Sequence, residues 1–207
     1  IKPPGPVSRG LKIGLLGGSF NPAHAGHLHI SDVAIKRLGL DYVWWLVAPQ
    51  NPLKPTQGMA PLSRRLEFAQ TETIGHPRIV VMDIEHALGT RYTIDTLTRL
   101  KRRFAEVNFV WLMGSDNLDG FRHWKRWQDI MQTVPMAVVT RPGSIMAMLH
   151  AKPAIRFCRG RTCDYRGLAR ARPPAVAVLD GPRNPLSSTA IRAQCAKSEI
   201  FVNLLPA

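Results

Sequence analysis

The sequence predicts an α/β fold: a doubly wound, Rossmann-like parallel sheet with helices on both faces, folded as a single domain. Two observations carry this prediction. Short apolar runs of strand type alternate with stretches of helical periodicity along the chain, and parallel neighbours in a sheet need crossover connections, which helices supply. A chain of 207 residues without an internal repeat or a clear linker also suits one core rather than two.

The expected strands are short apolar runs that end at glycine or proline. The first, 12–16, is closed by Gly17 and Gly18, and the second, 42–47, is stopped by Pro49. Glycine and proline interrupt regular structure, so these boundaries are informative. In chain order, the six strands are expected at 12–16, 42–47, 78–84, 107–113, 136–140 and 175–179.

The expected helices are stretches whose apolar residues recur at helical spacing. In 27–38, apolar side chains from Leu28 to Leu38 can share one face. The last helix begins near Ser188, where Ser187 or Ser188 can cap the first turn. The remaining helices are expected at 62–74, 93–104 and 124–131.

The domain organisation follows from composition. Residues 1–10 are rich in proline and are expected to form a flexible N-terminal segment, followed by one domain over 11–207. Within it, 151–174 combines many Arg and Lys residues with no regular apolar periodicity, so we expect a basic loop or insertion there.

The charge balance indicates an anionic partner without identifying it. The net charge is +14 and the pI about 10.7, values compatible with binding to nucleic acid, a nucleotide or a membrane surface, and also with a role in solubility alone. No apolar run approaches the roughly 18 residues of a membrane helix, and the Pro-rich start lacks a signal core. With only three scattered cysteines, we expect a cytoplasmic protein with reduced thiols.

The most informative segment, 17–27, reads GGSFNPAHAGH. Two glycines after a buried strand let the backbone approach a ligand, and the helix that follows offers N–H groups and a favourable dipole to an anion. His24 and His27 lie three residues apart, so both rings can face that anion, donate hydrogen bonds to phosphate oxygens and stabilise a departing pyrophosphate. No Cys or His cluster completes a metal ligand set, so no metal ligands are assigned.

A second phosphate segment is expected at 184–192, which reads NPLSSTAIR. A serine cap leaves the first N–H groups of the last helix available, and Arg192 in its first turn can hold the β- and γ-phosphates in a bidentate way. Alone, this is an ordinary capping sequence; its pairing with the histidine segment favours the functional interpretation. The G-x-G-x-x-G and P-loop motifs are both absent from the sequence.

Together these segments resemble a known family. H-x-G-H at 24–27 and S-S-T-x-I-R at 187–192 resemble the signatures of a nucleotidyltransferase superfamily. PQNPLK at 49–54, RYTIDTL at 91–97 and the Gly, Asp and Trp elements within 114–127 resemble, more narrowly, the bacterial nicotinate-nucleotide adenylyltransferases. The resemblance implies transfer of AMP from ATP, accompanied by Mg²⁺, to nicotinate mononucleotide, giving nicotinate adenine dinucleotide and pyrophosphate in NAD biosynthesis.

The resemblance also implies roles for individual residues. Catalytic contacts to the ATP phosphates are implied for His24, His27 and Arg192. Further ATP-binding positions are Gly17, Gly18, Ser19, Phe20, Gly114, Asp116, Ser188 and Thr189. Acceptor-binding positions are Lys54, Tyr92, Thr93, Trp124 and Lys125. Each has a plainer interpretation: Trp124 as core, with Trp127 the better core candidate, Lys54 as a solvated charge and Asp116 as a turn residue.

The sequence departs from the family pattern at two positions, and two alternative functions remain open. Asn21 stands where many relatives have Asp, and Leu186 where Ile or Val is usual. One alternative is another adenylyl- or cytidylyltransferase, for example with a phosphopantetheine acceptor, which Tyr92, Thr93 and Trp124 disfavour. The other is a basic nucleic-acid-binding module, which the lack of any recognised nucleic-acid motif disfavours. Oligomeric state and the preference between nicotinate and nicotinamide mononucleotide are not determined by the sequence.

Overall fold

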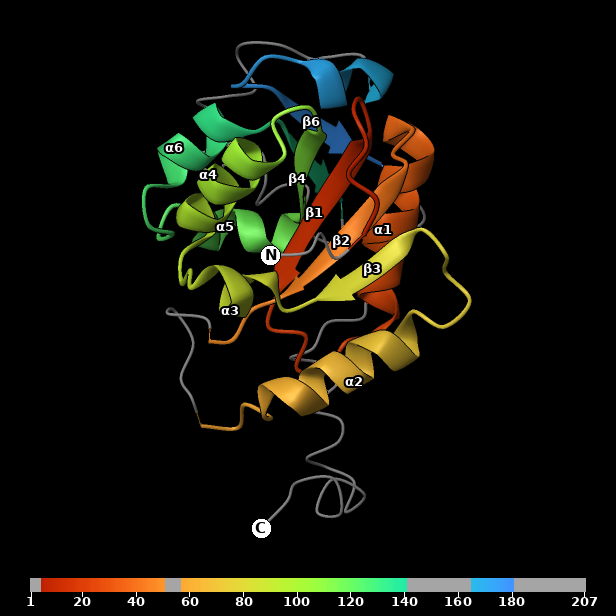
Figure 1. Cartoon of the computed structure of the whole chain (residues 1–207), viewed down its shortest axis with the longest axis vertical. Coiled ribbons are helices and arrows are strands. Elements are labelled where there is room, and N and C mark those ends of the chain that lie inside the picture. Colours follow the sequence, from red (N-terminus) through yellow and green to blue (C-terminus); the bar gives the residue numbers. More distant parts are fainter. Residues whose placement is uncertain (1–4, 51–56, 141–164, 181–207) are drawn as a thin grey trace.

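The computed structural model describes residues 5–50, 57–140 and 165–180 (Figure 1). Within them, six strands form one parallel sheet in the order β3-β2-β1-β4-β5-β6, so the predicted fold class is confirmed. This is the strand order of a doubly wound nucleotide-binding fold. The strands are β1 (Lys12–Gly18), β2 (Tyr42–Val47), β3 (Ile79–Met82), β4 (Asn108–Gly114), β5 (Met136–Val139) and β6 (Val176–Leu179).

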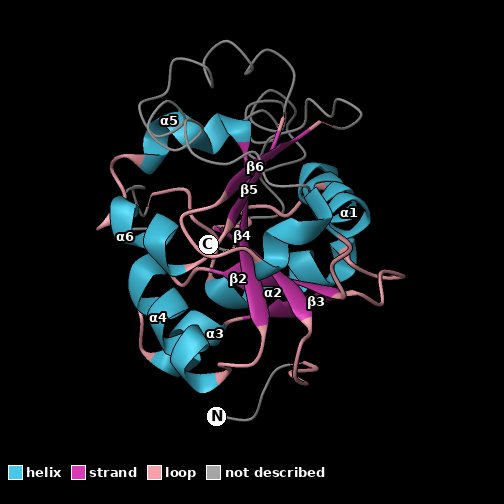
Figure 2. Cartoon of the chain, turned by 90° about the horizontal axis from the view of Figure 1, so that it is seen from above, coloured by secondary structure: helices cyan, strands magenta, loops and turns pink. Residues whose placement is uncertain are grey.

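Helices cover both faces of the sheet. Seen from above, α1 lies on one side and α3, α4 and α6 on the other (Figure 2). The α-helices are α1 (Ala25–Leu38), α2 (Leu62–Glu72), α3 (Ile84–Leu88), α4 (Thr93–Arg103), α5 (Leu118–Phe121) and α6 (Trp127–Thr133). Two 3₁₀ segments, η1 (Ser115–Asn117) and η2 (Tyr165–Arg170), complete the described elements.

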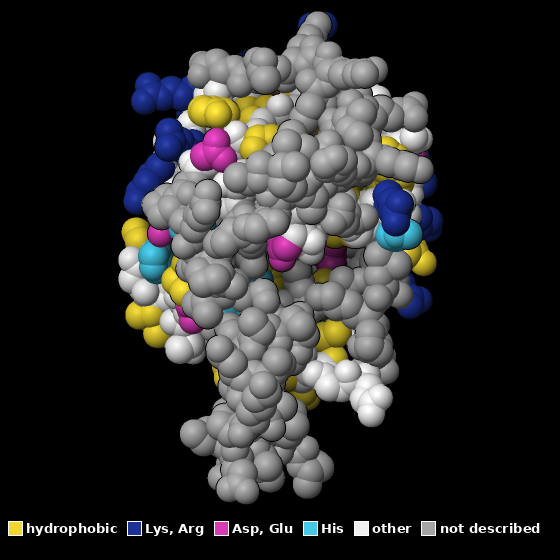
Figure 3. All heavy atoms as spheres, turned by 180° about the vertical axis from the view of Figure 1, so that it is seen from behind, with side chains coloured by type: hydrophobic (Ala, Val, Ile, Leu, Met, Phe, Trp, Pro, Cys, Tyr) yellow, Lys and Arg dark blue, Asp and Glu magenta, His cyan; other side chains and the backbone are white. Residues whose placement is uncertain are grey.

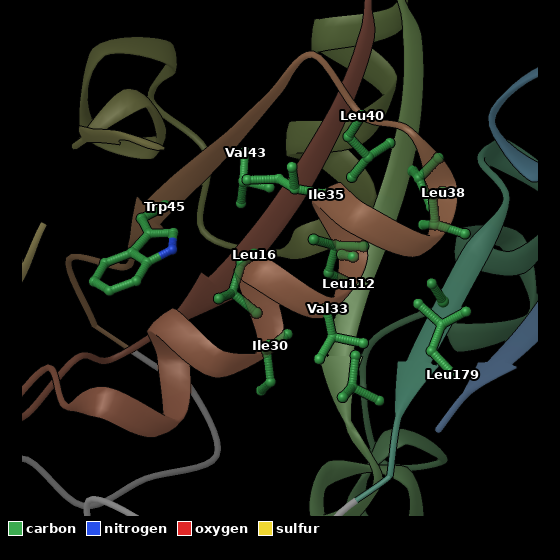
Figure 4. Close-up of a cluster of buried hydrophobic side chains, with 14 of the residues drawn as sticks. Leu16, Ile30, Val33, Ile35, Leu38, Leu40, Val43, Trp45, Leu112 and Leu179 are labelled. Carbon is green, nitrogen blue, oxygen red and sulfur yellow. The ribbon is translucent and has the colours of Figure 1, made fainter. Parts of the chain in front are cut away.

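The core has two layers, one on each face of the sheet. On the α1 side, Ile30 and Val33 pack against Leu16, Val43 and Leu112 of three neighbouring strands (Figure 4). On the other side, α4 packs against alternate strand residues, among them Leu15, Trp44 and Trp111. Because both faces are covered, the strands are apolar along most of their length, which explains the continuous apolar runs in the sequence.

Several boundaries differ from those predicted. The helix expected at 124–131 begins at Trp127, because Arg126 adopts a left-handed conformation with φ of 52°. The short helices α3 and η1 were not predicted, and η2 lies inside the expected basic loop, with Leu168 and Ala169 buried. Short elements carry too few residues to reveal a period. The helix expected near Ser188 lies outside the described residues.

Part of the N-terminal segment lies against the body of the domain. Val7 packs against the core on the α4 side. The Gly10 N–H donates to the carbonyl oxygen of Glu106 at 2.8 Å, and Asn108 Nδ2 donates to the Gly10 carbonyl at 3.1 Å. Residues 5–10 therefore run beside the start of β4. No helix in the described ranges is both long and apolar enough to cross a membrane.

A close contact between β1 and β4 sets the centre of the sheet. A Cβ atom on Gly17 would lie 2.4 Å from Cη2 of Trp111, so only glycine fits beside that indole. The order of the strands reverses between β1 and β4, and in such sheets ligands bind outside the carboxyl ends at the point of reversal. Gly17 thus allows the buried Trp111 indole to pack directly against β1 near this end of the sheet.

A buried carboxyl group supports the turn between α3 and α4. Thr96 Oγ1 donates to Glu85 Oε1 at 3.2 Å, and the hydroxyl groups of Thr90 and Thr96 lie 2.8 Å apart. The Thr90 N–H also donates to the Glu85 carbonyl oxygen at 2.9 Å. Burial raises the pKa of Glu85 above its ordinary value, while the hydrogen bond from Thr96 opposes that rise. The network fixes the segment that precedes Tyr92.

We predict that Gly17→Ala destabilises the protein by about 1–3 kcal/mol, since the added methyl group overpacks a closed core. Urea unfolding measures the effect. Gly120→Ala is the matched control, because nothing lies within 4 Å of its Cβ position and alanine favours a helix. Equal stability of wild type and Gly17→Ala would contradict the packing argument.

We predict that Glu85→Gln becomes progressively more stable relative to wild type as pH rises from about 4, the ordinary glutamate range. A raised pKa means that the folded state holds the proton more tightly. Wild-type stability contributed by this group is therefore complete below the unfolded pKa and is lost as pH rises through the folded pKa.

Urea unfolding between pH 4 and 8 measures this difference, with the exposed Glu67→Gln as control. A stability difference between Glu85→Gln and wild type that stays constant over this range would contradict the prediction.

Candidate active site

Most of the described residues that the sequence assigned to ATP lie at the carboxyl ends of β1 and β4. Figure 1 shows the arrowheads of β1 and β2 directed toward α2, which lies across this edge of the sheet. Gly17 and Gly18 end β1, and Ser19 and Phe20 begin the loop that leads to α1. Gly114 ends β4. This places the expected ATP residues on both sides of the point where strand order reverses.

The structure brings His24 and His27 together at the start of α1. His24 is the N-cap residue, and its Nδ1 accepts a hydrogen bond from the Gly26 N–H at 3.0 Å. His27 Nδ1 accepts from the His24 N–H at 3.3 Å, and the ring centroids lie 3.9 Å apart. Because each Nδ1 is an acceptor, each neutral ring carries its proton on Nε2. The two rings thus form a matched pair of Nε2–H donors.

This arrangement changes which groups can meet an anion at the helix start. His24 accepts the N–H of Gly26 on its side chain, and its carbonyl accepts the N–H of His27 at 2.8 Å. Those two backbone donors are therefore used within the helix. Direct contact of an anion with these two backbone N–H groups, which the sequence suggested, would therefore require these hydrogen bonds to open.

An aromatic wall supports His27. Phe20 is buried and stacks on Trp45 with ring centroids 5.0 Å apart, and its ring lies 4.6 Å from that of His27. Phe20 has φ of 48°, a left-handed conformation that a residue with a Cβ adopts at a cost of about 1–3 kcal/mol. Such strain is typical of functional sites. Here it directs a large ring between the sheet and the histidine pair.

Asn21 ties the same loop to the start of α2. Its Nδ2 donates to the Gly58 carbonyl at 2.9 Å, and its Oδ1 accepts from the Ala60 N–H at 3.2 Å. An aspartate could accept the second bond but could not donate the first. The amide thus gives a physical reason for asparagine at a position where the resemblance suggested Asp.

Of the residues assigned to the acceptor, four are described: Tyr92 and Thr93 at the start of α4, and Trp124 and Lys125 just before α6. Tyr92 is the N-cap residue of α4 and Thr93 its first residue, both half-buried. Lys125 Nζ lies 4.0 Å above the centre of the Tyr92 ring. Trp124 is half-buried and meets Trp111 edge-on, with ring centroids 5.9 Å apart. The structure therefore brings Tyr92 and Lys125 into contact.

The sequence suggested Trp127 rather than Trp124 as the core residue, but the structure does not separate the two in this way. Both are half-buried, both pack against the core on the α4 side, and both contact Phe121 edge-on. Because of the left-handed turn at Arg126, spacing along one helix does not decide which of the two tryptophans belongs to the core.

A cationic cavity opens beside Tyr92. It has a volume of about 950 Å³ and is lined from α3, α4 and the segment before α6. The positive lining favours an anionic ligand. Lys and Arg side chains also lie along the margins of the face seen from behind (Figure 3). The lining includes one carboxylate, Asp95, and the cations Arg91, Arg99, Arg102, Arg103, Lys125 and Arg126.

The other predicted site residues fall into two groups. Asp116 is exposed in η1, directly after β4. Lys54, Ser188, Thr189 and Arg192 lie outside the described residues. No group of three or more His, Cys, Asp or Glu side chains in the described part of the chain is arranged to hold a metal ion.

Two buried residues of the site region were missed by the sequence analysis. Glu85 supports the turn before Tyr92, and Arg65 of α2 donates hydrogen bonds to the loops that follow β1 and β2. In the sequence Arg65 follows another arginine, Arg64, and nothing in composition separates the buried one from the exposed one.

Comparisons with known proteins identify the family of this chain. The cytidylyltransferase-like family model matches residues 15–194. A probable nicotinate-nucleotide adenylyltransferase of Parvibaculum lavamentivorans is 55% identical over 188 residues, covering 90% of this chain and 93% of the relative. One from Cereibacter sphaeroides is 54% identical, covering 87% of this chain and 96% of the relative.

Solved structures share the fold at low sequence identity. The nicotinic acid mononucleotide adenylyltransferase of Plasmodium falciparum, complexed with NaAD, superposes with a TM-score of 0.66 at 15% identity, covering 88% of this chain and 83% of the other. The family assignment depends on the sequence matches, while this likeness supports the fold. The chain therefore belongs to the cytidylyltransferase-like family and, within it, to the nicotinate-nucleotide adenylyltransferases.

Proposed function

We propose that this protein transfers AMP from ATP to nicotinate mononucleotide, forming nicotinate adenine dinucleotide and pyrophosphate in NAD biosynthesis. The observation that carries the proposal is the histidine pair at the start of α1, in a chain 55% identical to a probable nicotinate-nucleotide adenylyltransferase over 90% of its length. The cationic cavity beside Tyr92 supports an acceptor that bears negative charge.

The reaction is a direct in-line displacement. A phosphate oxygen of the acceptor forms a new bond to the α-phosphorus of ATP, and the bond from that phosphorus to the bridging oxygen of the β-phosphate breaks. Pyrophosphate leaves with the electron pair, and no covalent enzyme intermediate forms. Such reactions depend on positioning and charge neutralisation rather than on a protein nucleophile.

The phosphate-binding residues neutralise the charge that develops on pyrophosphate. The Nε2–H groups of His24 and His27 donate to its oxygens, and Arg192 holds the β- and γ-phosphates. Ser188 and Thr189 assist at the start of the last helix. Gly17 and Gly18 let the backbone approach ATP closely. Asp116 faces the ribose hydroxyls, and Ser19, Phe20 and Gly114 are further ATP-binding positions.

The acceptor-binding residues recognise an aromatic acid that carries a phosphate. Trp124 stacks on the pyridine ring, and Tyr92, Thr93 and Lys125 surround the carboxylate, with Lys54 near the acceptor phosphate. The position of Lys125 Nζ over the Tyr92 ring supports this arrangement, since attraction to the aromatic face holds the cation next to Tyr92.

Magnesium would enter with ATP. Mg²⁺ usually keeps several of its waters and binds through substrate phosphate oxygens, so we expect no binding site made of protein side chains alone. When bound, Mg²⁺ supplies positive charge to the phosphate oxygens. The protein side chains supply the remaining neutralisation and the alignment.

The proposed reaction is tested by pyrophosphate release from Mg²⁺-ATP with three acceptors: nicotinate mononucleotide, nicotinamide mononucleotide and phosphopantetheine. We expect strong release with the first, because the pocket presents cations to a carboxylate. Release with phosphopantetheine alone would retain the reaction class and refute the acceptor. No release with any of the three would refute the enzymatic proposal.

We predict that His24→Asn lowers kcat by about 10²-fold, as loss of a donor to developing negative charge does elsewhere. Asparagine is a good N-cap residue, so the helix start should be retained and stability should change little. Steady-state kinetics and thermal unfolding separate the two effects.

The control for the histidine experiment is His86→Ala, which removes an exposed imidazole at the end of α3. Its kcat should equal that of wild type. A His24→Asn enzyme with wild-type kcat would show that the imidazole acts only as a cap.

A further inference from the structure

Arg65 of α2 is a buried cation that donates only to backbone carbonyl groups in its described hydrogen bonds. It is 1% exposed. Nη1 donates to Ser19 and Ala48 at 2.7 Å each, Nη2 to Pro49 at 2.7 Å, and Nε to Ala60 at 2.9 Å. Four of the five guanidinium N–H groups are therefore used, all by main-chain oxygens.

The four acceptors come from three separate segments. Ser19 lies in the loop between β1 and α1, which leads to the histidine pair. Ala48 and Pro49 follow β2, at the start of the loop expected to reach the acceptor. Ala60 directly precedes the first turn of α2. One planar side chain thus holds the loops for both substrates against the same helix.

Burying this charge is costly, so its retention needs a reason. An arginine kept from water without partners would be strongly unfavourable, and even a well-bonded buried charge is often no more stable than an apolar replacement. Burial lowers the pKa of Arg65, and its hydrogen-bonded carbonyl dipoles compensate the charge. Stability alone is a weak explanation for such an arrangement.

We propose that Arg65 is a positioning residue that sets the distance between the phosphate loop after β1 and the acceptor loop after β2. The inference assumes the reaction proposed above, in which the acceptor phosphate must approach the α-phosphorus in line. A misplacement of about 1 Å can cost on the order of 10²-fold in rate. Arg65 acts through the backbone, because its described bonds direct it to carbonyl groups.

The fork geometry explains why arginine is required. A guanidinium presents rigid, coplanar donors that can meet four carbonyl groups at fixed directions, while a lysine ammonium presents three donors from one point. Arg64 provides the contrast within the same helix: it is exposed, and its Nη1 lies 2.9 Å from Glu67 Oε2. Such an exposed ion pair contributes little to the stability of the fold.

The test compares Arg65→Lys and Arg65→Gln with the matched control Arg64→Lys. For each protein we would measure the thermal midpoint, and then kcat and both KM values well below that midpoint. Hydrogen exchange of residues 19–24 and 48–50 reports on the two loops directly. Arg65→Gln removes the buried charge and keeps two N–H donors. It provides the second test of the proposal if Arg65→Lys does not fold.

We expect kcat of folded Arg65→Lys to fall by about 10- to 100-fold, with faster exchange in both loops and unchanged exchange in the central strands. Arg65→Gln should show the same pattern, and Arg64→Lys should match wild type. The positioning role is overturned if the Arg65 variants lose only thermal stability and keep wild-type kcat, KM values and loop exchange.

Failure of the proposed reaction is distinguishable from failure of this inference. If the wild-type enzyme is inactive with every acceptor, the proposed reaction is refuted. Hydrogen exchange in the two loops requires no acceptor, so it still tests whether Arg65 holds them. Loop exchange that is identical in wild type and in a folded Arg65 variant refutes the positioning role whatever the activity.

Discussion

The parallel direction of all six described strands is the constraint on which the rest of the structure depends. It brings the carboxyl ends of the strands to one edge, so that loops far apart in sequence meet there. Strand order reverses between β1 and β4, the point at which such sheets bind ligands, and Gly17 there lets β1 pack directly against the Trp111 indole. A site built this way takes its specificity from loops and helix starts, while the buried strands supply only rigidity.

Helix starts fix two of the proposed functional side chains. His24 is the N-cap of α1 and Tyr92 the N-cap of α4. In the first case the hydrogen bond that begins the helix also determines which ring nitrogen carries the proton. A short, capped imidazole loses less conformational freedom on binding than a long flexible side chain would. Stability of the fold and orientation of the donors therefore depend on the same hydrogen bonds.

The sequence predicted most of what local patterns control. The six strands, the long helices and the histidine pair were all expected from apolar runs, spacing and the two phosphate segments. The left-handed turn at Arg126 was not, because no glycine or proline marks it. The role of Arg65 was not visible either, since burial is set by the tertiary placement of α2, and Arg64 beside it is chemically identical. Asn21 was noticed only as a departure, and its two bonds to the 58–60 segment give the reason.

The most direct test of the account is nitrogen NMR of the histidine side chains, with and without Mg²⁺ and a non-hydrolysable ATP analogue. The account predicts that His24 and His27 are Nε2–H tautomers in the neutral state, and that their Nε2 resonances shift on adding the analogue. The exposed His86 and His123 should not shift. Nδ1–H tautomers at the pair, or unchanged resonances at saturating analogue, would contradict the claim that the helix start presents two imidazole donors to the ATP phosphates.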